Sequence, residues 1–177
     1  MTPRARASVR AMLRIEAGGA GDGARLLALF DDAVRWLVAR GQTGQWGSEP
    51  FSAHPARVER ADAWAASGGL WFAEDDAGGT AGAIVLGAAH DYVPPAERPE
   101  LYVQVLLTAA AWRGRGVGAR LIDHAVALAR ERGAEQLRVD CWDGVPELPA
   151  QYERLGFTRT GSFDGDGWPG ALLVRAV

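Results

Sequence analysis

Several features that define whole classes of protein are scarce in this sequence. It has one cysteine, Cys141, so neither an internal disulfide nor a metal site made only of cysteines can form within the chain. No apolar run reaches the roughly 20 residues that a membrane-spanning helix needs. The net charge is -3, without the basic excess that nucleic-acid-binding proteins usually carry. We therefore expect a cytoplasmic protein that binds neither a membrane nor nucleic acid.

Metal-binding and thiol-nucleophile patterns are also missing. The three histidines, His54, His90 and His124, show no metal-ligand spacing. None of them is spaced as a partner for Cys141, which a nucleophilic cysteine requires. The sequence therefore predicts no metal site, and it predicts that Cys141 is a small buried thiol.

What is present is the composition of an ordinary globular domain. The chain has 177 residues, of which 48% are hydrophobic and 23% charged. Residues 1–8 contain arginines but no apolar signal-peptide core follows them, so we expect a flexible N-terminal tail. Residues 9–177 are expected to form a single domain.

The hydrophobic pattern predicts a mixed α/β fold. Helical spacing and flanking glycines predict four helices, at residues 24–40, 55–67, 116–132 and 146–155. Strands are expected at residues 9–15, 70–74, 81–89, 101–108, 136–141, 157–163 and 171–177. Short turns predict antiparallel hairpins, whereas the long helix at 116–132 is a crossover between two parallel strands. The expected sheet is thus mostly antiparallel with one parallel pair.

A glycine-rich turn lies between the fourth expected strand and the third helix. Gly114, Gly116 and Gly118 alternate with Arg113, Arg115 and Val117. Glycine allows a phosphate to approach the backbone, and a helix N-terminus offers free N–H groups to it. The two arginines add positive charge that suits phosphate oxygens. The turn therefore predicts a phosphate-bearing ligand.

Two familiar phosphate motifs fit this turn less well. The sequence lacks the Gly-Lys-Ser/Thr end of a P-loop. Gly114, Gly116 and Ala119 match a loose dinucleotide fingerprint, with Asp140 ending the next strand. However, residues 108–112 separate the strand from the first glycine, and the chain after Gly118 is too short for a second half of a doubly wound sheet.

Two segments resemble the GNAT superfamily of N-acetyltransferases. Residues 106–118 (LLTAAAWRGRGVG) resemble its acetyl-CoA motif, and residues 151–157 (QYERLGF) resemble its second signature. The expected order of elements also matches, so the resemblance covers residues 9–177. It implies a GNAT-like fold, in which that domain is an N-acetyltransferase with acetyl-CoA as co-substrate.

The resemblance implies a role for three groups of residues. Backbone groups of the fourth strand would pair with the pantetheine arm, and amides of the turn would hold the pyrophosphate. The implied cofactor-binding residues are Leu106, Leu107, Thr108, Arg113, Gly114, Arg115, Gly116, Val117, Gly118 and Ala119. Tyr152 aligns with the catalytic acid that protonates the departing thiolate, for which a phenol with a pKa of about 10 is suitable.

The base that takes the proton of the amine stays open among several residues. The candidates are Glu100, Tyr102, Gln104 (through a water), Asp140, His90 and Asp91. The acceptor site is expected to be built by the first two helices and their loop. Its expected lining is Trp36, Gln45, Trp46, Trp71, Tyr92, Tyr102 and Gln104, with Glu49, Asp91 and Glu100 suited to a cationic amine.

The resulting hypothesis is direct transfer of acetyl to a primary amine of a small molecule or peptide. Two alternatives remain, which are a non-catalytic acyl-CoA sensor on the same fold and a dinucleotide-binding domain. The resemblance also implies that two copies can pair as a homodimer.

Overall fold

A computed structural model describes residues 12–177 of the chain. Its elements, in chain order, are β1 (Arg14–Ala17), α1 (Gly23–Val38), η1 (Phe51–Ala53), α2 (Pro55–Ala66), β2 (Leu70–Glu74), β3 (Thr80–Gly87), β4 (Glu100–Thr108), η2 (Ala110–Trp112), α3 (Val117–Glu131), β5 (Gln136–Trp142), α4 (Glu147–Arg154), β6 (Thr158–Gly165) and β7 (Trp168–Ala176). The expected tail at residues 1–8, and residues 9–11 of the first expected strand, lie outside the described part.

The strands form one sheet in the order β1-β2-β3-β4-β5-β7-β6. Every neighbouring pair is antiparallel except β4 and β5, which are parallel because α3 connects them. The mixed α/β fold predicted from the sequence is therefore confirmed. β1 is shorter than expected and begins at Arg14.

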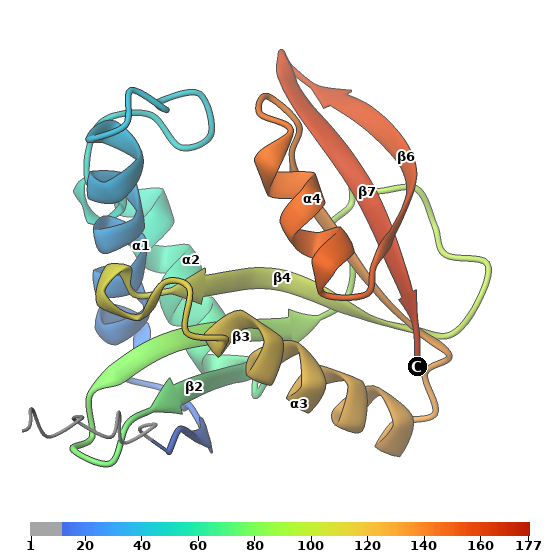
Figure 1. Cartoon of the computed structure of the whole chain (residues 1–177), viewed down its shortest axis with the longest axis horizontal. Helices are drawn as coiled ribbons and strands as arrows, with labels where there is room; N and C mark the ends of the chain where they lie inside the picture. Colours follow the sequence, from blue (N-terminus) through green and yellow to red (C-terminus); the bar gives the residue numbers. More distant parts are fainter. Residues whose placement is uncertain (1–11) are drawn as a thin grey trace, which may run out of the picture.

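Helices cover both faces of the sheet (Figure 1). On one face α1 packs through Leu26 and Phe30, and α2 through Ala61, in one buried cluster that also contains Phe72 and Val85 of the sheet. On the other face α3 packs its buried stripe, which includes Leu121 and Ala125, against a second cluster that also contains Tyr152 of α4. Each strand in the middle of the sheet is thus buried on both sides.

The middle of β4 contains a β-bulge. Val85 pairs with Val105 but Leu86 pairs with Val103, so Gln104 has no partner of its own on β3. A bulge shifts the alternation of side chains between the two faces. Leu101 and Val103 accordingly face α3, whereas Val105 and Leu107 face α1 and α2.

The two parallel strands separate after this bulge. They pair from Glu100 with Gln136 as far as Val103 with Val139. Beyond that point β4 stays paired with β3 through Thr108, and β5 stays paired with β7 through Trp142. The sheet is therefore open between residues 104–108 and residues 140–142, and the backbone of β4 has a free edge there.

Candidate active site

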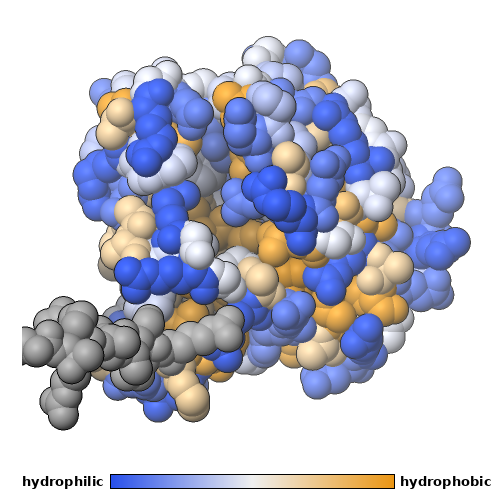
Figure 2. Space-filling view, viewed as in Figure 1, coloured by the Kyte–Doolittle hydropathy of each residue, from blue (hydrophilic) through white to orange (hydrophobic). Residues whose placement is uncertain are grey.

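A cavity of about 690 Å³ occupies the opening between β4 and β5. It is lined by α1, α2, the loop that joins them, both separated strands, and α4. Figure 2 shows a hollow on this face with hydrophobic residues at its floor and hydrophilic residues around it. The free edge of β4 at Leu106, Leu107 and Thr108 lines the cavity. The resemblance implies that these residues bind a cosubstrate through their backbone.

The glycine turn leads into the first turn of α3 beside the cavity. Gly114 and Gly116 have positive φ angles of 73° and 79°, which side chains rarely tolerate. A Cβ would have no atom within 4 Å at any of the three glycines, and Gly118 differs only because its φ is not positive. Gly118 lines the cavity. The fold therefore requires glycine at 114 and 116 but leaves open space at 118.

The remaining residues of the turn lie at different depths. Arg113 lines the cavity and stacks over Trp36, with 3.9 Å from its Cζ to the ring centre. Burial lowers the pKa of Arg113, and its Nε is buried without a hydrogen-bond partner among the described residues. Val117 is in the core, Arg115 is exposed, and neither lines the cavity. Gly114, Gly116 and Ala119 also lie outside its lining.

Tyr152 is the residue for which the resemblance implies a role as catalytic acid. It comes from α4, lines the cavity and is 9% exposed. Its ring meets Phe157 edge-on at 5.8 Å. Burial is the main cause that raises the pKa of Tyr152, and the neighbouring Cys141 and Asp140 raise it further. The phenol therefore stays protonated across the neutral range, which is the form that a proton donor requires.

Asp140 organises a second polar group on the wall of the cavity. Its carboxylate accepts a hydrogen bond from Tyr102 at 2.5 Å and one from Tyr92 at 3.3 Å. His90 stacks on Tyr92 at 5.1 Å between ring centres, and it meets Tyr102 edge-on. Burial lowers the pKa of His90, although the charge of Asp140 acts in the opposite direction. His90 is therefore neutral at pH 7 and available to accept a proton.

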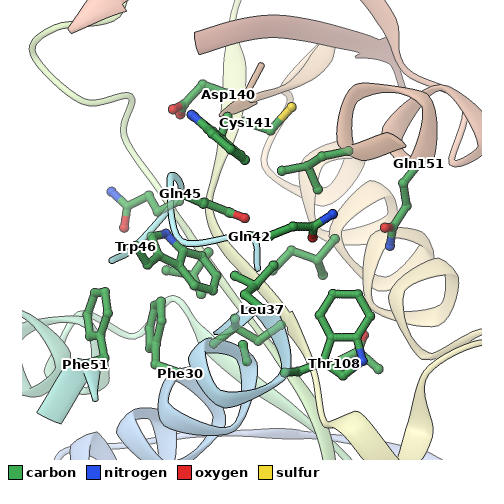
Figure 3. A pocket seen from close by; sticks show the side chains of 18 of the residues that line it. Phe30, Leu37, Gln42, Gln45, Trp46, Phe51, Thr108, Asp140, Cys141 and Gln151 are labelled. Atoms are coloured by element: carbon green, nitrogen blue, oxygen red, sulfur yellow. The ribbon is translucent and has the colours of Figure 1, made fainter. Parts of the chain in front are cut away.

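An aromatic wall faces this group from α1, α2 and their loop. Phe30 stacks on Phe51 at 4.1 Å and on Trp64 at 5.9 Å, and Trp46 meets Phe30 edge-on at 5.5 Å. Figure 3 shows Phe30, Trp46 and Phe51 on one side of the pocket, with Asp140 and Cys141 across from them. The expected acceptor residues Trp36, Gln45, Trp46, Tyr92 and Gln104 all line the cavity.

Trp71 is the expected acceptor residue that the structure places on the wrong face. Its ring packs against His124 of α3, 4.3 Å away, and it belongs to the cluster under α3. Because β2 is buried on both faces, its hydrophobic pattern could not indicate which face Trp71 would take. Trp71 is a packing residue.

Other expected polar residues also lie outside the cavity. Glu49 is exposed and lies 3.5 Å from His54. Glu100 pairs with Arg138, and Asp91 is exposed. Tyr102 is fully buried behind Asp140 and contributes only through its hydroxyl. Of the candidate bases, His90, Asp140 and the water-holding Gln104 line the cavity.

Several residues of the cavity were not predicted from the sequence. Phe30, Phe51, Trp64, Arg57, Arg60, Trp142 and Trp168 all line it. A signal was present for two of them, because Arg57 and Arg60 are three residues apart and share one face of α2. No signal marked Trp168, which comes from the last hairpin and donates its Nε1 hydrogen to the carbonyl of Gln45.

Cys141 lies on the cavity wall but is not poised as a nucleophile. Burial raises the pKa of its thiol to about 12, so the thiolate is scarce at neutral pH. Residues 12–177 contain no group of three or more His, Cys, Asp or Glu side chains that could hold a metal ion. Nor do they contain a helix with the length and hydrophobicity to cross a membrane.

An opened sheet, Arg113 and Gly118 beside a helix N-terminus, and a buried tyrosine thus meet at one cavity. The model of the acetyltransferase (GNAT) family matches residues 31–157, and the chain belongs to that family.

Relatives agree with this assignment. Glucosamine 6-phosphate N-acetyltransferase 1 of Oryza sativa subsp. japonica is 32% identical over 146 residues, which cover 80% of this chain and 85% of that protein. A mycothiol acetyltransferase of Beutenbergia cavernae is 30% identical, covering 80% of this chain and 51% of that protein. The matches span between 34% and 51% of the length of three of the curated relatives.

A solved structure shares the fold. An acetyltransferase of the GNAT family from Listeria monocytogenes 4b F2365 superimposes with a TM-score of 0.73 at 23% identity, covering 93% of this chain and 95% of that one.

Proposed function

We propose that the protein transfers acetyl from acetyl-CoA to a primary amine of a small molecule or peptide, by direct attack within a ternary complex. The observation that carries this proposal is that the free edge of β4, Gly118 of the glycine turn and Tyr152 all line one cavity. The family and the rice relative, whose name gives it N-acetyltransferase activity, support the same reaction.

The cavity offers fitting partners for each part of acetyl-CoA. The unpaired backbone at residues 106–108 suits an amide-bearing arm that lies beside β4 like an added strand. The helix N-terminus and the unpartnered Arg113 suit the pyrophosphate. When bound, acetyl-CoA supplies a thioester whose carbonyl carbon the amine attacks.

Three side chains would then take part in the two proton transfers, one from the amine and one to the departing sulfur. His90, kept neutral by burial, takes the proton that the acceptor nitrogen must lose, either from its ammonium form before attack or from the amine as the C–N bond forms, directly or through a water. Asp140 orients the group by holding Tyr92 and Tyr102. A new C–N bond replaces the C–S bond, and Tyr152 gives its proton to the departing sulfur. We place this reaction in the cytoplasm, a proposal supported by a sequence with one cysteine, which does not depend on an internal disulfide.

The substitution Gly118→Ala tests the cosubstrate site. Alanine in this helix would meet open space, so stability should rise by about 0.5–1 kcal/mol relative to glycine. If the space belongs to the pyrophosphate, acetyl-CoA affinity measured by calorimetry should fall by about tenfold or more.

The matched control is Gly19→Ala, which also meets open space at ordinary φ but lies outside the cavity. It should leave the affinity unchanged. Equal affinity of the Gly118→Ala variant and the unaltered protein would contradict the assignment.

Release of free thiol with a panel of amines tests the reaction itself. Polyamines, amino acids, amino sugars and peptide N-termini make up the panel. Acetyl-CoA binding without thiol release would favour a sensor module, and NAD binding without CoA binding would contradict the cosubstrate.

A further inference from the structure

Four arginines line the cavity, and they fall into two groups. Arg113 and Arg40 stack on the ring of Trp36, next to the glycine turn. Arg57 and Arg60 come from α2, beside the aromatic wall. None of the four forms an ion pair with another residue in the described part of the chain, 12–177. The first group has a ligand in the proposed pyrophosphate, whereas the second has none.

Arg57 is held in place by the aromatic wall. Its Cζ lies 4.4 Å from the ring centre of Phe51, which itself stacks on Phe30. The side chain is half-buried, and its Nη1 is buried without a hydrogen-bond partner among residues 12–177. Leaving a buried charged donor unpaired is unfavourable, so the arrangement is more stable when an acceptor oxygen reaches this guanidinium.

Arg60 lies one turn further along the same face of α2. Its Cζ is 5.9 Å from the ring centre of Trp64. Its positive charge lowers the pKa of both His90 and Tyr92, although burial and Asp140 also act on them. The charge of Arg60 therefore acts across the cavity on His90 and Tyr92, which lie beside Asp140 where the amine would bind.

The acidic side chains that line the cavity do not neutralise the positive charges of Arg57 and Arg60 on α2. They are Asp140, which already accepts hydrogen bonds from two phenols, and Glu147 of α4. The α2 side of the acceptor space is thus positive, and the Asp140 side is negative. A molecule with an amine at one end and an anion at the other would match both.

We propose that the acceptor carries an oxyanion, a carboxylate or a phosphate, which binds Arg57 and Arg60 while its amine lies at His90 and Asp140. Planar guanidinium groups bind both anions through paired hydrogen bonds. The inference rests on the proposed function, because it names the class of amine that this site acetylates.

Matched pairs of amines test the inference. The carboxylate arm compares phenylalanine with its uncharged amide, and the phosphate arm compares phosphoethanolamine with ethanolamine. The unaltered protein should favour the anionic member of at least one pair by about tenfold in kcat/KM, and the better arm identifies the anion. Equal or better use of both neutral members would overturn the inference.

Variants of the two arginines locate the anion. Arg57→Gln and Arg60→Gln should each reduce the preference severalfold while acetyl-CoA affinity is kept. Arg57→Lys should give an intermediate preference, because lysine keeps the charge without the paired geometry. The matched control, Arg130→Gln, removes an exposed arginine outside the cavity and should change neither quantity. A loss of acetyl-CoA affinity in Arg57→Gln, with the preference intact, would assign the arginines to the cosubstrate instead and overturn the inference.

Calorimetry on the CoA-saturated protein separates this inference from the proposed function. Binding of an anionic amine that depends on Arg57, without any thiol release from acetyl-CoA, would support the anion site and contradict the transferase. Thiol release without an anionic preference would support the transferase and contradict the anion site.

Discussion

The hydroxyl of Tyr152 is the proton donor that we place nearest to the departing sulfur. Because burial raises its pKa, this phenol keeps its proton well above neutral pH. Replacing Tyr152 with phenylalanine should lower kcat at least about tenfold, since general acid catalysis contributes on the order of 10²–10⁴. Acetyl-CoA affinity should persist because the ring still fills its place.

The control for this variant is Phe157→Leu, which alters the packing next to Tyr152 and leaves its hydroxyl intact. It should lower stability by about 1 kcal/mol with a much smaller loss of kcat. Unchanged turnover of Tyr152→Phe across the pH range would remove this residue from the mechanism.

The pH dependence of kcat should reveal the protonation state of His90. Its pKa lies below the usual histidine value of about 6.5, and a base acts only after losing its proton. The ratio of kcat between the unaltered protein and His90→Gln should therefore rise from acid pH to a plateau already reached near neutrality. Taking the ratio cancels the titration of the amine itself.

Asp140→Asn provides the companion measurement. Removing the negative charge that raises the pKa of His90 should move the midpoint of this rise to lower pH. A ratio that does not depend on pH would assign the proton transfer to a water instead of His90.

Some residues of the site can be predicted from the sequence, and others cannot. The glycine turn and Tyr152 belong to contiguous motifs, so their positions followed from local sequence. The expected acceptor residues come from separate elements, and the direction in which each side chain points depends on how those elements pack. Glu49 illustrates this, because only the folded loop shows that it lies near His54 and outside the cavity.

At the scale of elements, an ion pair closes the end of the sheet where β4 and β5 still pair. The guanidinium of Arg138 on β5 binds the carboxylate of Glu100 on β4, with 2.7 Å between Nε and Oε2, and it also donates to the carbonyl of Pro94 at 2.6 Å. Arg138→Met would leave Glu100, which is mostly buried, without a partner. We expect unfolding by denaturant to show a loss of roughly 3 kcal/mol.

The double variant Arg138→Met/Glu100→Leu is the control, because it removes both charges together. Much of the lost stability should return, since an apolar pair of similar volume avoids an unpaired buried charge. Equal losses of stability in the single and double variants would mean that the ion pair between Arg138 and Glu100 does not stabilise the contact between β4 and β5.

The elements themselves were largely predictable. Long periodic segments such as α1 and α3 follow directly from the spacing of their buried residues. The bulge at Gln104 was not predictable, because a shift in strand register depends on the neighbouring strand and leaves no local pattern. Strict alternation of side chains along β4 is therefore broken at Gln104, and Val103 and Val105 lie on opposite faces of the sheet.

At the scale of the whole molecule, the cavity separates two parts of one sheet. β1 to β4 lie on one side of the opening, and β5 to β7 lie on the other. A cosubstrate that contacts β4, the turn before α3 and α4 would join the two parts. At about 100 times its dissociation constant it should stabilise the protein by about 2.7 kcal/mol, and raise Tm by roughly 5–10 °C.

Thermal unfolding with acetyl-CoA checks this expectation, and NAD at the same concentration serves as the control. A larger rise with NAD would support the dinucleotide alternative.

The family and the fold class were accessible from the sequence, because both depend on element order and two motifs. The class of acceptor was not accessible, because the charged and titratable side chains that indicate it come from α2, the loop after β3, β5 and α4, and only the fold brings them to one cavity.

The gap between β4 and β5 has one more consequence, which concerns how the chain behaves before it meets a ligand. An ordinary open sheet presents two outer borders to its surroundings, whereas this one presents a third and a fourth inside its own cavity. Exposed borders of this kind recruit stray strands and promote self-association. If acetyl-CoA binds along β4 as proposed, it would cover one of these borders and so reduce self-association as well as supply the acetyl group.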